Sequence, residues 1–284
     1  MEDAKLKINN INNIYTSTNK KRLDVIIPSR NSKNQKIFLK NSIQSIINQK
    51  IDKDIEIRVI ICVDPNFNND NLPSTQKLQI KVIQSKKPSQ AHALNSGILE
   101  SDADYVSFLE DDDSWQPNFL ETSLKNLNQL LNKDKFGITS STQLEINSEK
   151  QIIRVNDFPT PSGWLMNSAT LSHVGLFNTK YSLHLDNDWL GKAALKNIPR
   201  FHLIEGLAPI NVQYCGQVRP WLALVVNNSK KTCSLKRHKY LIPLVNRLVH
   251  SESGMASIAK DKFKKELSFK EINLLKTSYG LIPW

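Results

Sequence analysis

Short apolar segments alternate with helix-like segments along the first half of the chain, and this rhythm restricts the possible folds more than any other feature. The apolar runs of strand length cover residues 23–28, 55–63, 80–83 and 105–109. Apolar side chains at mainly helical spacing lie between or after them, in residues 37–47, 91–99 and 118–131. Strands that consist of continuous apolar runs are buried on both faces. We therefore predict an α/β fold, with a mixed and mainly parallel central sheet flanked by helices.

The rest of the chain is less regular, and its composition changes at both ends. The further predicted elements are strands at 138–143, 151–155 and 207–214 and a helix at 186–195. From residue 217 onward the pattern is helical: residues 268–271 (SFKE) fit a capping box, and Gly280 fits a helix stop. We therefore divide the chain into an Asn-rich flexible leader (1–20), one α/β domain (21–216) and a basic helical C-terminal extension (217–284).

The charge of the chain is concentrated in the extension. The 284 residues carry a net charge of +11, and residues 217–284 hold 13 Lys or Arg against 4 Asp or Glu, which is +9 of that total. Such a surface can face nucleic acid, an anionic membrane or a phosphorylated ligand, or can be merely solvated. The chain has no apolar run of about 20 residues and no basic-then-apolar leader, so we expect a cytoplasmic protein. Its three cysteines form no CxxC pair, which argues against a disulfide framework or a structural zinc site.

Four consecutive carboxylates, in residues 110–113 (EDDD), follow the apolar run 105–109. Adjacent carboxylates repel one another, so a cation must offset the cost of placing them together. A hard divalent ion is suitable, because Mg²⁺ binds one or two protein carboxylates and completes its octahedron with substrate phosphates and water. The alternative is a solvated acidic turn before the helix that starts near Pro117, since acids are favourable near a helix N-terminus.

Further carboxylates lie at predicted strand and helix ends. Asp64 follows the strand 55–63, where a turn residue and a ligand contact are equally good interpretations. Asp186 and Asp188 open the helix 186–195, either as N-terminal caps or as a general base that faces a bound hydroxyl. The sequence has no GxGxxG, GxxxxGK[ST] or GxSxG motif and no HxH or HxxxH pair. This weighs against dinucleotide, P-loop, serine-hydrolase and histidine-metal sites.

Taken together, these segments resemble family 2 of the glycosyltransferases, which are inverting enzymes with the GT-A fold that use nucleotide-activated sugars. The resemblance covers about residues 22–215 and is most specific at residues 108–117 (FLEDDDSWQP), which resemble the DxD motif with its following aromatic residue and proline. Residues 24–31 (DVIIPSRN) resemble the opening strand and nucleotide-contacting turn. Residues 93–98 resemble the family's helix before the metal-site strand. Residues 168–178 resemble its acceptor-side strand with the GGF turn, and residues 186–192 resemble its catalytic helix.

The resemblance implies a role for individual residues. Asp112 would bind the metal, Mg²⁺ or Mn²⁺, and Asp186, or less readily Asp188, would act as general base. Trp164 and Trp189 are expected on the acceptor side, where they would stack on sugar faces unless they pack in the core. The implied contacts to the nucleotide sugar are Pro28, Ser29, Arg30, Asp64, Asn95, Glu110 and Asp111.

The chain departs from the family pattern in several places. Glu110 stands at the first DxD position, which is usually Asp, and Leu185 replaces the acid that commonly precedes the base. Residues 175–176 (GL) replace a double glycine. Arg219 and Trp221 are not adjacent, as they are in the QxxRW element of processive relatives, so we do not infer processivity.

The activity implied by the resemblance is the metal-dependent, inverting transfer of a sugar from a nucleoside diphosphate donor, with UDP preferred, to an acceptor hydroxyl. The implied setting is cell-surface glycan assembly, with a glycan, lipid-linked or small-molecule acceptor and no nucleic acid. We expect the extension 217–284 to cover the acceptor side or to contact the inner face of the membrane or a second copy of the chain. The alternatives are a nucleotidyltransferase, a glycoside hydrolase, or a non-catalytic protein that binds anionic surfaces through its basic extension.

Overall fold

The computed structural model describes residues 20–30, 35–65, 75–156, 160–203, 243–250, 253, 258, 260–280 and 282–283. The predicted leader lies outside these residues except for its last position. The predicted strand 207–214 and the first part of the extension, residues 217–242, also lie outside them.

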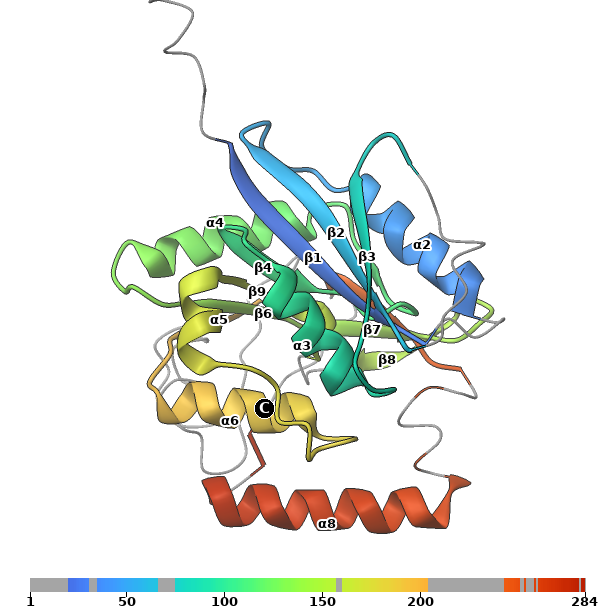
Figure 1. The fold of residues 1–284 in the computed structure, drawn as a ribbon. Helices are drawn as coiled ribbons and strands as arrows, with labels where there is room; N and C mark the ends of the chain where they lie inside the picture. Colours follow the sequence, from blue (N-terminus) through green and yellow to red (C-terminus); the bar gives the residue numbers. More distant parts are fainter. Residues whose placement is uncertain are drawn as a thin grey trace, which may run out of the picture.

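A seven-stranded sheet forms the centre of the molecule (Figure 1). In spatial order its strands are β10 (Arg200–Leu203), β6 (Ile138–Ser141), β9 (Trp164–Asn167), β4 (Tyr105–Phe108), β1 (Lys21–Ser29), β2 (Ile55–Val63) and β3 (Gln79–Gln84). Neighbouring strands are parallel, except that β9 runs antiparallel to both β4 and β6. The structure therefore confirms the predicted α/β fold with a mixed, mainly parallel sheet.

Helices cover both faces of this sheet (Figure 1). One face packs against α2 (Gln35–Ile47) and α4 (Phe119–Leu131), and the other against α3 (Gln90–Glu100), α5 (Ser168–Val174) and α6 (Leu185–Leu195). Alternate residues of β1 serve the two faces: Val25 and Ile27 pack with the first group of helices, and Ile26 packs with the second. Because both faces are covered, successive apolar residues of β1, β2 and β4 are buried, as their sequences indicated.

A second sheet of four strands lies beside the central one, in the order β5 (Ser114–Trp115), β11 (Val245–Leu248), β7 (Gln143–Ile146) and β8 (Ile152–Asn156). Strand β11 belongs to the extension, so the prediction that the extension is helical is wrong at this point. The cause is a long-range pairing: β11 runs parallel to β7 and antiparallel to β5, and both partners are distant in sequence. A four-residue segment placed between two strands satisfies its backbone hydrogen bonds through its neighbours.

The extension ends in α8 (Lys262–Tyr279), which packs against α6 (Figure 1). The helix begins at Lys262, six residues before the predicted capping box, because the side chain of Asp261 caps it by accepting hydrogen bonds from the backbone N–H groups of Phe263 and Lys264. The predicted stop is confirmed, since Gly280 follows the helix in the left-handed conformation with φ of +75°. Within the part of the chain that is described, no helix combines the length and the apolarity that crossing a membrane requires.

The contact between α6 and α8 depends on a small residue. A Cβ atom at Gly191 of α6 would lie 2.6 Å from the ring of Tyr279. Glycine at position 191 therefore lets the tyrosine ring lie directly against the backbone of α6.

Candidate active site

The carboxyl ends of β1, β2 and β4 meet at one edge of the central sheet, and most of the predicted donor-binding residues lie there. Ser29 is the last residue of β1 and pairs with Val63, so Arg30 and Asp64 follow side by side beyond the strand ends. Glu110 comes two residues after the end of β4. Ligands of open α/β sheets bind beyond this edge.

Four of the predicted donor residues interact with one another, two through a hydrogen bond and the others through their charges. The Ser29 hydroxyl donates a hydrogen bond of 2.5 Å to Oδ2 of Asp111. Burial raises the pKa of Asp64, and the positive charge of the nearby Arg30 opposes this rise. The same arginine also acts on Asp111. Pro28 is buried within β1, so it contributes the rigid backbone that precedes this turn.

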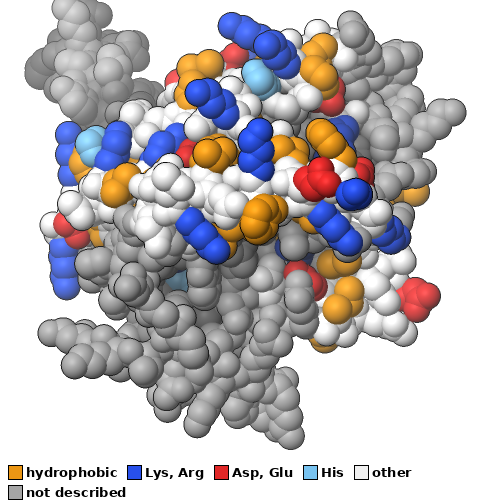
Figure 2. Space-filling view, turned by 90° about the horizontal axis from the view of Figure 1, so that it is seen from below, with side chains coloured by type: hydrophobic (Ala, Val, Ile, Leu, Met, Phe, Trp, Pro, Cys, Tyr) orange, Lys and Arg blue, Asp and Glu red, His pale blue; other side chains and the backbone are white. Residues whose placement is uncertain are grey.

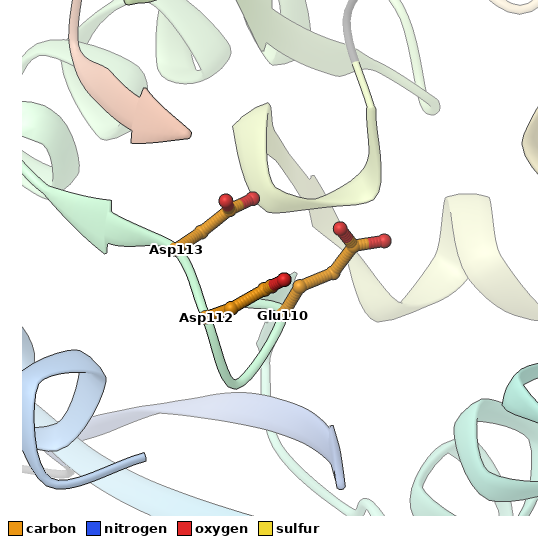
Figure 3. Close-up of side chains that lie close together, drawn as sticks. All are labelled: Glu110, Asp112 and Asp113. Carbon is orange, nitrogen blue, oxygen red and sulfur yellow. The ribbon is translucent and has the colours of Figure 1, made fainter. Parts of the chain in front are cut away.

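Three carboxylates converge on one point after β4. Glu110, Asp112 and Asp113 each offer an oxygen such that all three oxygens lie within 4.8 Å of one another, and their side chains leave the turn toward a common space (Figure 3). Both carboxylate oxygens of Asp113 are buried, and neither has a hydrogen bond of good geometry from the described residues, although the nearby Ser162 hydroxyl lowers the pKa of Asp113. A buried carboxylate is costly unless a cation neutralises its charge, so this donor set fits a hard divalent ion.

Within residues 110–113, which form the acidic cluster, three carboxylates bind protons more tightly than isolated carboxylates do. Burial, followed by the charge of Asp112, raises the pKa of Glu110 to about 7 and that of Asp111 to about 7. The same two causes, joined by the charge of Glu110, raise the pKa of Asp113 well above its usual value. Without a cation, the cluster therefore retains protons near neutral pH.

Strand β11 adds two basic residues that the sequence did not indicate. His250, just after β11, has its Nε2 atom 3.0 Å from Oδ2 of Asp112. Arg247 has its Nη1 atom 3.4 Å from Oε1 of Glu145. The positive charge of Arg247 opposes the rise in the pKa of Glu110, Asp113 and Asp186 that burial causes. No local motif marks these residues, because 138 positions separate His250 from Asp112. Asp113 was also missed, although its place in the EDDD run was a signal.

The two candidate bases on α6 have different surroundings. Asp188 is buried: its Oδ1 accepts a hydrogen bond of 2.8 Å from Tyr279, and Lys192 lies 3.8 Å from its Oδ2. Asp186 is partly exposed, and among the described residues it accepts a local hydrogen bond of 2.9 Å from the backbone N–H of Asn187. Burial raises the pKa of Asp186, and its charge in turn raises that of Glu110. Of the two, Asp186 is therefore the carboxylate whose charge acts on Glu110, whereas Asp188 is bonded to Tyr279 of α8.

Three predicted binding residues have structural roles instead. The amide of Asn95 bonds the backbone of Phe177 twice, donating to its carbonyl at 2.9 Å and accepting from its N–H at 2.8 Å. Trp164 and Trp189 are fully buried, and both pack against Phe177. Their ring faces are covered, so of the two alternatives, core packing is the one observed. The sequence could not separate these alternatives, because buried and sugar-stacking tryptophans follow the same pattern.

Manganese is expected to raise the melting temperature more at about pH 7.5 than at about pH 5.5. The folded-state pKa of Glu110 lies above the usual 4.5, at about 7, so the folded chain holds a proton that the unfolded chain has lost. The metal-free protein therefore loses stability as the pH rises from about 4.5 to about 7. Metal ligands must be deprotonated, so the ion competes with this proton and binds more tightly at higher pH. Differential scanning fluorimetry with Mn²⁺ or EDTA measures both trends; a shift independent of pH would contradict the assignment of Glu110 and Asp113 to the metal.

Comparison with known proteins gives the class of this chain. Residues 24–177, just over half of the sequence, match the profile of Glycosyl transferase family 2, and the chain belongs to that family. This finding confirms the predicted family and favours a glycosyltransferase over the nucleotidyltransferase and glycoside hydrolase alternatives.

Individual proteins that resemble this chain share only part of its sequence or a low sequence identity with it. A GalNAc(5)-diNAcBac-PP-undecaprenol beta-1,3-glucosyltransferase of Campylobacter jejuni is 32% identical over 115 residues, which cover 38% of this chain and 35% of that protein. The match thus spans about a third of the curated relative. Structures of S. aureus TarS in complex with UDP and with UDP-GlcNAc have TM-scores of 0.51 and 0.52 at 12% and 14% identity. They cover 90% of this chain and 65% and 66% of those chains, and they show a shared fold.

Proposed function

We propose that this chain transfers a sugar from a UDP-sugar to an acceptor hydroxyl, with inversion and with Mg²⁺ or Mn²⁺ at the acidic cluster. One observation carries the proposal: three carboxylates, one of them with both oxygens buried, converge after β4, where the charge of a partly exposed aspartate on α6 acts on Glu110. A metal-binding group together with a general base suits single displacement, because one stabilises the charge of the leaving diphosphate and the other activates the acceptor hydroxyl.

Each group has a distinct task in this proposal. Glu110, Asp112 and Asp113 would hold the ion, which supplies positive charge where the leaving diphosphate gains negative charge. Asp186 would take the proton of the acceptor hydroxyl on the opposite side of the sugar. The residues that would bind the nucleotide are Ser29, Arg30, Asp64 and Asp111, which lie beyond the ends of β1, β2 and β4. Holding donor and acceptor together removes much of the entropic cost of their encounter.

Calorimetric titration of UDP in the presence of Mn²⁺, and again in EDTA, tests the donor site. The proposal expects binding with Mn²⁺ and its loss or strong weakening in EDTA. Equal binding in both conditions would contradict the metal role. If UDP does not bind but GDP or dTDP does, the nucleobase assignment is wrong while the donor site stands.

A lipid-linked acceptor is the class we favour, and the outer face of α8 supports it. The Campylobacter relative is named for an undecaprenol-linked acceptor. On α8 the side chains of Phe263, Phe269 and Leu274 are 72%, 68% and 50% exposed. Figure 2 shows hydrophobic side chains next to Lys and Arg side chains across the face that contains α8. The exposed lysines of the helix are Lys262, Lys265, Lys270 and Lys276.

The protein is therefore expected to bind vesicles that contain phosphatidylglycerol and not vesicles of phosphatidylcholine alone. Each lysine near an anionic surface contributes up to about 1 kcal/mol, and salt weakens this attraction. Phe263→Ala with Phe269→Ala should reduce co-sedimentation with the anionic vesicles, whereas Lys150→Glu, an exposed lysine outside α8, serves as the matched control. Equal sedimentation of both variants would exclude α8 as the contact, and self-association through α8 would appear instead as a dimer without lipid.

A further inference from the structure

The side-chain carboxylate of Glu271, on α8, accepts hydrogen bonds from the segment that precedes α6. Glu271 is 2% exposed although it is charged. Its Oε1 accepts the backbone N–H of Ser182 at 2.8 Å, and its Oε2 accepts the N–H groups of Leu183 and His184, both at 3.0 Å. His184 is the residue before α6, and Asp186 lies in the first turn of that helix.

Other contacts from the same part of the chain hold α6 on both sides of Asp186. Ser268, one turn before Glu271, has its hydroxyl 2.8 Å from Nε2 of His184. The side-chain amide of Asn187 donates a hydrogen bond of 2.7 Å to the carbonyl oxygen of Pro283. The Tyr279 hydroxyl donates a hydrogen bond of 2.8 Å to Oδ1 of Asp188. Residues 182–184 before the proposed base and residues 187–188 after it are thus bonded to α8 and to Pro283, while the Asp186 carboxylate itself remains partly exposed.

The chemistry of this contact requires a carboxylate. An ionised carboxylate only accepts hydrogen bonds, so it can serve three converging N–H donors. A glutamine in its place would turn an NH₂ group toward backbone N–H groups and would leave at least one of them buried without an acceptor. The sequence pattern that resembles a capping box for α8 therefore has another use: Ser268 and Glu271 bond the segment that precedes α6.

We propose that Glu271 is a positioning residue for catalysis, which acts by fixing residues 182–184 and through them the orientation of Asp186. The inference rests on the proposed function, because it takes Asp186 as the base. A displacement of about 1 Å in a reacting group can lower the rate about 10²-fold, even when the altered residue is remote from the chemistry. Glu271 does not contact the acidic cluster among the described residues, so it leaves the donor site unchanged.

The first test is Glu271→Gln, followed by hydrogen exchange and by hydrolysis of UDP-glucose and UDP-GlcNAc in water with Mn²⁺. The amides of residues 182–184 should exchange at least about tenfold faster than in the unaltered protein, since their acceptor is lost. The kcat should fall about 10²-fold, with the KM for the donor and the calorimetric affinity for UDP unchanged. Glu271→Asp, which keeps the charge, should restore part of the rate.

Leu275→Ala is the matched control, because Leu275 is fully buried on the same helix and one turn beyond Glu271. It should lower the melting temperature by creating a cavity while kcat below that temperature stays within about twofold of the unaltered protein. An equal loss of kcat in Leu275→Ala and Glu271→Gln would overturn the proposal, since general weakening of the helix contact would then suffice. Unchanged amide exchange in Glu271→Gln would overturn it irrespective of activity.

The double variant Asp186→Asn with Glu271→Gln separates this inference from the proposed function. If Glu271 acts only through Asp186, the double variant turns over as slowly as Asp186→Asn alone. A further loss in the double variant would overturn the positioning role. If Asp186→Asn retains full activity while Glu271→Gln does not, the base assignment fails and the segment that Glu271 fixes serves another group.

Discussion

Replacing Asp186 by asparagine is expected to lower turnover by about 10²- to 10⁴-fold, which is the usual contribution of a positioned general base. Asparagine has the same shape but cannot take the proton of the acceptor hydroxyl. The affinity for UDP with Mn²⁺ should not change, because the donor residues lie beyond the strand ends rather than on α6. Release of UDP from UDP-sugars measures turnover, and calorimetry measures the affinity.

Asp188→Asn is the appropriate comparison, since this carboxylate lies two residues away on the same helix. It is buried and bonded to Tyr279, so its replacement should lower stability and change turnover by less than about tenfold. The reverse result, with Asp186→Asn active and Asp188→Asn inactive, would transfer the role of base to Asp188.

Replacing Asp112 by alanine is expected to abolish the Mn²⁺-dependent part of UDP binding. The change removes one of three converging carboxylates and leaves His250 without the partner 3.0 Å away. Because the ion is shared between the protein and the diphosphate, the loss should be seen in the affinity for UDP as well as in turnover. Titration of UDP with Mn²⁺ and in EDTA should then give the same weak affinity for the variant.

Asp134→Asn controls for the change in net charge, because Asp134 is an exposed acid outside the cluster. Its affinity for UDP should match that of the unaltered protein. An Asp112→Ala variant that still binds UDP more tightly with Mn²⁺ would show that Glu110 and Asp113 hold the ion without Asp112.

Local patterns predicted the first half of the central fold, because the elements there are encoded by their own residues. Strands β9 and β10 were not predicted, and residues 168–174, which resemble a strand of the family, form helix α5 instead. The apolar runs of β1, β2 and β4 are buried on both faces, so burial and sequence pattern agree. Strand β11 shows the limit of this reasoning. Its four residues form a strand because β5 and β7 lie on either side, and neither partner can be inferred from residues 245–248 alone.

The candidate site divides in the same way. Residues that follow strand ends, such as Ser29, Asp64 and Glu110, could be placed from the sequence because parallel strands deliver their carboxyl ends to one edge. His250 and Arg247 reach that edge from β11, so no local spacing marks them. The sequence left Trp164 and Trp189 open between sugar stacking and core packing, and it placed Asn95 at the donor. A polar side chain can instead satisfy its hydrogen bonds within the fold, as Asn95 does with the backbone of Phe177.

The close contact between Gly191 and Tyr279 has an evolutionary consequence. Any side chain at position 191 would occupy the space of the tyrosine ring, since even a Cβ atom would lie 2.6 Å from it. A smaller residue at position 279 would in turn leave a gap beside α6 and remove the hydroxyl that binds Asp188. The two positions therefore constrain one another's substitutions across the 87 residues between them, and a change at one of them is best tolerated after a compensating change at the other.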